Sequence, residues 1–127
     1  MTEAIHRLNQ GDWVHIFPEG KCYQESASAT LGRSPLKWGV GHLIMNSRPL
    51  LLPLVHSGLE AVKPLHQNRI GLGVDVRVTV GQVVDTDDWL QQTSDITDEA
   101  KRRSRITEMV EEELKSLLHQ QNVAMGR

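Results

Sequence analysis

Apolar residues recur along the chain with two different spacings, and these spacings predict the order of its helices and strands. Helical spacing predicts a short first helix over residues 1–10, with three apolar side chains on one face. Aromatic and β-branched residues predict a strand over residues 13–17, which Pro18 should end because proline cannot donate to a strand ladder. Small and polar residues then predict a loop over residues 23–33.

A second helix is predicted from Pro35 to about Met45, since Ser34 is a good N-cap and proline suits the first turn. Gly39 and Gly41 lie inside this segment, and each weakens a helix by roughly 1 kcal/mol relative to alanine. Two glycines placed in this way predict close packing against a neighbouring element.

Two apolar segments in the middle of the chain predict strands of different exposure. Residues 50–56 form a continuous apolar run, which is typical of a strand buried on both faces. Residues 74–80 alternate strictly and predict a half-exposed strand, with four valines on one side. These valines are Val74, Val76, Val78 and Val80. The order of elements predicts an α/β fold, a mixed sheet with flanking helices and a long C-terminal helix.

The longest helix is predicted over residues 95–121, where apolar side chains form a stripe at helical spacing. The stripe consists of Ile106, Met109, Val110, Leu114, Leu117 and Leu118. It favours a helix packed on the sheet over an amphipathic helix that binds a membrane or a partner. Four cations near its start either form a solvated face or touch anionic lipid, and we prefer the solvated face. They are Lys101, Arg102, Arg103 and Arg105.

Composition narrows the possible functions. The chain has 127 residues, the length of one domain, and a formal net charge of −2, which argues against a dedicated nucleic-acid binder. Its one cysteine, Cys22, excludes an intramolecular disulfide and a four-cysteine zinc site. The N-terminus has no signal-peptide pattern, and the apolar stretch over residues 50–55 is far shorter than the about 20 residues that span a bilayer. Any membrane contact of these residues is therefore expected to be peripheral.

Two short motifs resemble those of a known enzyme family. Phe17–Gly20 reads F-P-E-G after a predicted strand and resembles the third motif of the glycerolipid acyltransferases. Leu51–Val55 lies downstream and resembles the fourth motif of that family, an apolar strand around a proline. Within the family, residues 6–21 and 37–44 resemble the tafazzins, and Lys21 directly after the glycine is similar to them as well.

The resemblance extends to about Val84 and becomes weak in the last helix. It implies that residues 1–127 form a single partial acyltransferase domain, its C-terminal part. It further implies acyl transfer between phospholipids and lysophospholipids without coenzyme A, especially the remodelling of cardiolipin at mitochondrial membranes. Neither a metal nor another cofactor is expected, since His42 and His56 lack a third ligand at a sensible spacing.

The base of this family, a histidine in H-x-x-x-x-D, is missing from the sequence. The fifth residues after the six histidines are Gly11, Gly20, Ser47, Ala61, Gly71 and Ala124. None of them is aspartate, so we assign no catalytic residue and expect the isolated chain to be inactive. His15 shares a strand face with Trp13 and Phe17, and we interpret it as a hydrogen-bonded strand residue rather than a replacement base.

The resemblance implies that the F-P-E-G turn and the next residue form one wall of a lipid headgroup site. The predicted substrate-binding residues are Phe17, Pro18, Glu19, Gly20 and Lys21. Glu19 is the foremost candidate, and its alternative role is a turn carboxylate that accepts from a backbone amide. Lys21 either attracts phosphate as a point charge or is simply solvated. Cys22 stands where many relatives have arginine, which leaves phosphate clamping at that position open.

Two functional hypotheses remain open on the sequence. In the first, the chain is a section of an acyltransferase whose catalytic histidine and aspartate lie in another segment. In the second, it is a non-catalytic module that binds membranes, other copies of itself or full-length relatives through an exposed apolar surface. Both hypotheses predict an unpaired strand edge beside residues 13–17.

Overall fold

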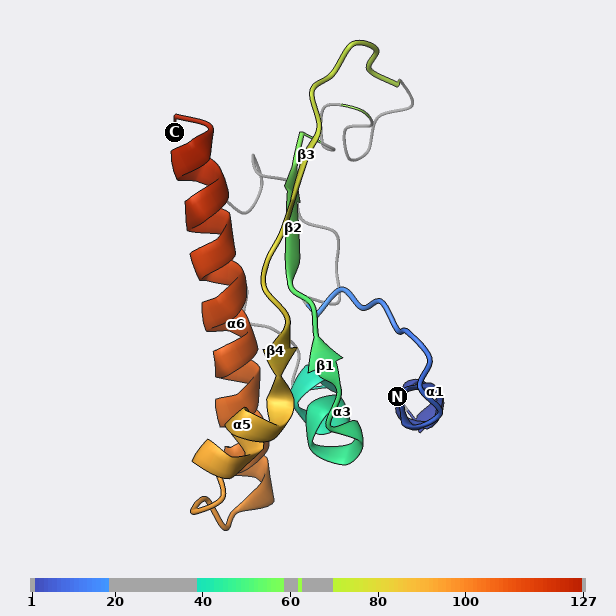
Figure 1. Cartoon of the computed structure of the whole chain (residues 1–127), viewed down its shortest axis with the longest axis vertical. Helices are drawn as coiled ribbons and strands as arrows, with labels where there is room; N and C mark the ends of the chain where they lie inside the picture. The colour runs from blue at the N-terminus through green and yellow to red at the C-terminus, as the bar shows by residue number, and fades with distance from the viewer. Residues whose placement is uncertain (1, 19–38, 59–61, 63–69, 127) are drawn as a thin grey trace.

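In the described part of the chain, four short strands form a narrow antiparallel ribbon, and a long helix lies along one face of it (Figure 1). The structure, a computed structural model, describes residues 2–18, 39–58, 62 and 70–126. The elements are α1 (Thr2–Asn9), α3 (Gly39–Ser47), β1 (Leu50–Leu51), β2 (Leu54–Ser57), β3 (Arg77–Val80), β4 (Val84–Asp85), α5 (Thr86–Gln92) and α6 (Glu99–Ala124). The α/β class is confirmed, but the described strands form two small antiparallel sheets instead of one mixed sheet.

The ribbon is divided into two sheets at Pro53 and Gly81. β1 pairs with β4 on one side of this break and β2 pairs with β3 on the other, both antiparallel. At the break, the amide of Gly81 donates to the carbonyl of Pro53 over 2.8 Å, which holds the two halves together. The prediction of one strand over residues 50–56 was therefore wrong, because proline has no N–H to donate to a ladder.

The two faces of the β2–β3 sheet differ in what covers them. Val55 pairs with Thr79 in the register, and the side chain of Thr79 accepts a hydrogen bond of 2.8 Å from Gln121 of α6. Val78 and Val80 lie on the opposite face and remain 57% and 56% exposed. β3 is shorter than predicted but is half exposed as expected, with its valines on the uncovered side. The expected burial of residues 50–56 on both faces was also wrong, since Leu50 is 71% exposed.

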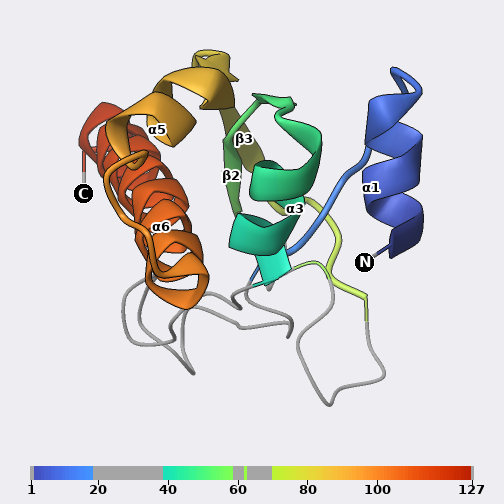
Figure 2. The ribbon, with the colours of Figure 1, turned by 90° about the horizontal axis from the view of Figure 1, so that it is seen from below.

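The core lies between α6, α3, α5 and the inner face of the ribbon. The predicted apolar stripe of α6 supplies five of the ten buried residues of this core in the described part of the chain, which confirms that this helix packs inside the protein. The buried core residues are Val40, Ile44, Val55, Trp89, Leu90, Ile106, Met109, Val110, Leu114 and Leu117. Gly41 of α3 confirms the predicted close packing, because a Cβ there would collide with the backbone carbonyl of Arg103 on α6. Figure 2 shows α3 beside α6, with α1 on the far side of α3.

The helix α5 was missing from the predicted order of elements. Its N-cap is Asp85, whose carboxylate accepts from the amide of Asp87 over 3.0 Å. At the other end, Arg102 of α6 donates to the carbonyl of Leu90 over 2.7 Å and to the hydroxyl of Thr93 over 3.2 Å. At least one of the four cations near the start of α6 thus holds two helices together instead of facing solvent.

Candidate functional site

The segment that leads into the F-P-E-G motif is extended but unpaired. Residues 12–17 adopt no regular secondary structure, and no described strand pairs with them, so the predicted strand over residues 13–17 is not formed. Strand composition is insufficient here, because an isolated strand gains its stability only from a neighbour in a sheet. Phe17 is 69% exposed and Pro18 is half buried. The other three predicted site residues, Glu19, Gly20 and Lys21, lie outside the described residues.

The segment nevertheless keeps the alternation of a strand. Val14 and Ile16 are half buried, and Ile16 packs against the core. Trp13, His15 and Phe17 are exposed, with Trp13 at 92%. The rings of His15 and Phe17 lie 4.9 Å apart between centroids. The predicted common side for these three residues thus agrees with their exposure, whereas His15 contacts an aromatic ring instead of forming a hydrogen bond within the described residues.

The run that resembles the fourth motif anchors the ribbon to the core. Pro53 and Val55 are buried, and Val55 belongs to the core cluster on α6. Leu52 points outward and is 42% exposed. The proline that is central to this motif therefore marks both the break in the ribbon and the point where the ribbon meets α6.

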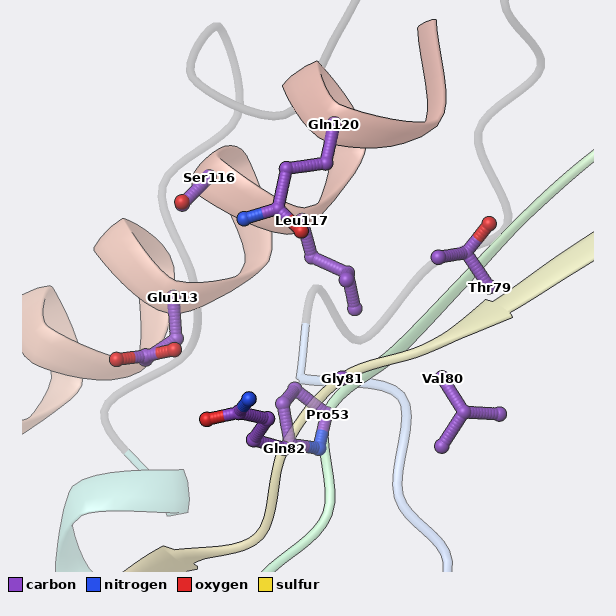
Figure 3. Close-up of a pocket in the computed structure, with 9 residues that line it drawn as sticks. All are labelled: Pro53, Thr79, Val80, Gly81, Gln82, Glu113, Ser116, Leu117 and Gln120. Atoms are coloured by element: carbon purple, nitrogen blue, oxygen red, sulfur yellow. The ribbon is translucent and has the colours of Figure 1, made fainter. Parts of the chain in front are cut away.

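A pocket of about 480 Å³ opens beside this proline, between the ribbon and α6 (Figure 3). The ribbon contributes Pro53, Gly81 and Gln82 to its wall, and α6 contributes Glu113, Ser116 and Gln120. Neither Phe17 nor Pro18 lines it. These three residues of α6, Glu113, Ser116 and Gln120, lie outside the apolar stripe of the helix. Sequence periodicity therefore predicts only that they face solvent, and not that they line a pocket. Ser116 and Glu113 both line the pocket, but no hydrogen bond joins this hydroxyl to this carboxylate within the described residues, so we assign no nucleophile and base to it.

Metal binding and membrane spanning find no support in the described part of the chain. No three or more histidine, cysteine, aspartate or glutamate residues in residues 2–18, 39–58, 62 and 70–126 gather as a metal site would require. None of the helices in those ranges combines the length and the apolar character needed to cross a bilayer.

A family model described as Acyltransferase matches residues 1–57, which contain both the F-P-E-G motif and the run around Pro53. This part of the chain is similar to the acyltransferase family. Its curated relatives include a protein described as Tafazzin from Drosophila melanogaster, 32% identical over 118 residues, which cover 90% of this chain and 30% of the relative. A protein described as Taffazin from Dictyostelium discoideum is 36% identical over 87 residues, 61% of this chain and 29% of the relative.

A third relative is described by a different activity. It is an N-acylphosphatidylethanolamine synthase from Arabidopsis thaliana, 41% identical over 70 residues, which cover 54% of this chain and 23% of the relative. The chain thus spans less than a third of the length of each of these relatives. No solved structure matches the chain. The similarity to the family therefore rests on sequence, and the activity of the whole relatives does not transfer to this chain by itself.

Proposed function

We propose that residues 1–127 form one section of a phospholipid acyltransferase of the tafazzin type. The full enzyme would move acyl chains between phospholipids and lysophospholipids, with cardiolipin as the preferred substrate. The observation that carries the proposal is the family match over residues 1–57, because that stretch contains F-P-E-G and the apolar run around Pro53 in the order the family requires. The name of the Arabidopsis relative, an N-acylphosphatidylethanolamine synthase, supports phospholipids as the substrate class.

The catalytic and substrate-binding groups would be divided between this section and another section of the full enzyme. The hydroxyl of a lysophospholipid attacks the carbonyl carbon of a donor ester, a base accepts the hydroxyl proton, and the donor glycerol oxygen leaves with that proton. Hydrogen-bond donors or cations stabilise the oxyanion that forms in between. This sequence has no H-x-x-x-x-D, so the base belongs to another segment. Phe17, Pro18, Glu19, Gly20 and Lys21 would form a wall of the headgroup site, with Lys21 attracting phosphate.

The exposed aromatic side chains before the motif support a site at a lipid surface. Trp13 and Phe17 are 92% and 69% exposed, and both precede Glu19 closely in the chain. Tryptophan is favoured at membrane interfaces because its ring is apolar and its N–H can remain in contact with water. Peripheral association with a mitochondrial membrane is therefore part of the proposal.

A chimaera tests this function. The section of Drosophila tafazzin that matches this chain is replaced by residues 1–127, and transfer of a labelled acyl chain from phosphatidylcholine to monolysocardiolipin is measured. We expect transfer by the chimaera and none by the isolated 127-residue chain. Glu19→Ala should abolish transfer if the motif forms the site, whereas Glu99→Ala, at the exposed start of α6, should leave transfer unchanged. An active isolated chain, or an active Glu19→Ala chimaera, would overturn the proposal.

The alternative is a non-catalytic binding module, and the same exposed apolar residues favour it. In this case the chain by itself would sediment with cardiolipin vesicles, and Trp13→Ala would reduce the sedimented fraction. A chain that stays in the supernatant as a monomer contradicts this alternative.

A further inference from the structure

One side of the ribbon is apolar and uncovered. On this side, β3 and the residue before it present Val76, Val78 and Val80, with exposed fractions of 42%, 57% and 56%. We refer to these three residues as the valine face. In the register, Val80 stands opposite Leu54 and Val78 opposite His56 of β2, so the face continues onto the neighbouring strand. In Figure 3, Val80 points away from α6.

The segment before the motif begins on this same side. Figures 1 and 2 place α6 on one side of the β2–β3 sheet and the start of this segment, beside α1, on the other, whereas Ile16 further along reaches the core. Trp13 and Phe17 add two exposed aromatic side chains along the segment. Two uncovered features of the molecule thus share one side, a sheet face and the start of a strand-like segment without a described partner strand.

We infer that the valine face is the surface on which the acyltransferase section carrying H-x-x-x-x-D docks. The inference rests on the proposed function and names the partner that the site needs. A β-branched strand face is normally covered by a second layer of helix or sheet, because burial of its apolar area stabilises the fold. Within the described residues the β2–β3 sheet has two strands, and no further described strand pairs with either outer edge.

The uncharged valine face and the greater length of the relatives favour this section as the partner over a membrane or a second copy of the chain. None of Val76, Val78 and Val80 is charged, so the valine face itself contributes none of the basic residues by which peripheral proteins recognise anionic lipid. The chain spans only 23% to 30% of its relatives, whose remaining length is ample to supply a second layer. A partner docked on this side would also approach Phe17, where its histidine is needed. A second copy of this chain would bring no H-x-x-x-x-D.

The experiment pairs this chain with the section it lacks. Drosophila tafazzin with the matching section deleted is co-expressed with the tagged 127-residue chain, and the Kd of the purified pair is measured. Val78→Glu and Val80→Glu each place a charge on the valine face and should raise the Kd by ~10-fold or more. Val123→Glu is the matched control, since Val123 is a 61% exposed valine near the end of α6. It should leave the Kd unchanged.

A milder variant tests whether a loss of binding reflects a loss of folding. Val78→Thr keeps the β-branched shape and should weaken binding less than Val78→Glu, with the same thermal midpoint as the unmodified chain. Failure of the unmodified chain to bind, equal Kd values for Val78→Glu and Val123→Glu, or a homodimer that Val78→Glu dissociates would each overturn the inference. Sedimentation with cardiolipin vesicles that depends on Val78 would overturn it in favour of a membrane.

Binding and activity separate the inference from the proposed function. A pair that forms through Val78 but transfers no acyl chain supports the docking surface and contradicts the acyltransferase function. An active chimaera in which Val78→Glu has no effect supports the function and contradicts the docking surface.

Discussion

The two sides of the ribbon carry similar apolar residues, but these residues are buried on one side and exposed on the other. On the α6 side, Val55 is 6% exposed and packs with Ile106, which is fully buried. On the other side, Val78 and Val80 have the same chemistry as Val55 but are more than half exposed. The difference is the presence of a second layer, because a strand buries a face only where a helix or sheet covers it. We therefore expect stability to reside on the α6 side, and binding on the valine face.

The largest contrast between the two sides should come from truncating one residue of each. Ile106→Ala removes a side chain with no exposed area and leaves a cavity, which should lower the free energy of unfolding by about 2–5 kcal/mol. Val78→Ala should change it by roughly 0.5 kcal/mol or less, since the valine is mostly exposed. Urea denaturation followed by circular dichroism measures both. Equal losses would show that the valine face is covered within this chain.

A polar contact links α6 to the ribbon and gives the next effect. Gln121 is 1% exposed, and its amide nitrogen donates to the hydroxyl of Thr79 over 2.8 Å. Thr79→Val removes that acceptor while keeping the volume, and should lower the free energy of unfolding by roughly 1–3 kcal/mol. Val78→Thr is the matched control at the exposed neighbour and should have little effect.

A double variant shows whether the loss comes from the unpaired amide. Thr79→Val combined with Gln121→Leu removes both side-chain partners of this hydrogen bond and leaves only the Arg77 carbonyl, which accepts more weakly from Gln121 over 3.5 Å. It should therefore recover much of the stability lost in Thr79→Val alone. Simple addition of the two single losses would contradict a contribution from this hydrogen bond, because contacting residues are expected to be non-additive.

The contact of α3 with α6 should respond to a single methyl group. In Gly41→Ala the new Cβ would collide with the carbonyl of Arg103 and lie 2.5 Å from the hydroxyl of Thr107. The resulting strain of about 1–3 kcal/mol exceeds the roughly 1 kcal/mol that alanine gains in a helix. We expect a net loss of stability, measured as a lower urea midpoint. A stabilised variant would contradict the close packing.

Much of the α6 side could be predicted from the sequence, because helical periodicity is local. The stripe of α6 and Gly41 both indicated burial that the structure confirms, whereas Gly39 is only half buried. α5 was not predicted since it is only seven residues long and has few apolar positions. Its C-terminal end is fixed by Arg102, twelve residues away from Leu90, and such a contact leaves no local pattern.

The side of the ribbon away from α6 was harder to predict from the sequence, and the reason is physical. Whether residues 13–17 form a strand depends on a neighbouring strand, and composition does not reveal whether one is present. The alternation of residues 74–80 indicated one exposed face but did not tell which face α6 covers. The F-P-E-G motif pointed to the family whose model matches residues 1–57. Glu19 and Lys21 lie outside the described residues, so their role in the site stays a prediction.

The smallest effect should come from an ion pair on the solvent side of α6. Arg105 donates to Glu112 over 3.1 Å and to Glu108 over 3.3 Å, and its side chain is 42% exposed. The hydrogen bond from Arg105 to Glu112, followed by the attraction of their charges, raises the pKa of Arg105. Because the pKa is higher in the folded state, the added stability is present below the unfolded pKa and lost only as pH rises through the folded one.

Glu112→Gln should therefore cost only a few tenths of a kcal/mol, since exposed pairs are screened by solvent. The cost should shrink at about 1 M salt, where the Debye length falls to about 3 Å. It should also stay constant between about pH 6 and about pH 9, far below the range in which arginine titrates. Urea midpoints at both salt concentrations and both pH values test this, with Arg105→Met completing a double-mutant cycle. A loss of more than about 1 kcal/mol in the free energy of unfolding would mean that this exposed ion pair contributes as much as a buried contact. That result would contradict the expected difference between buried and exposed surfaces.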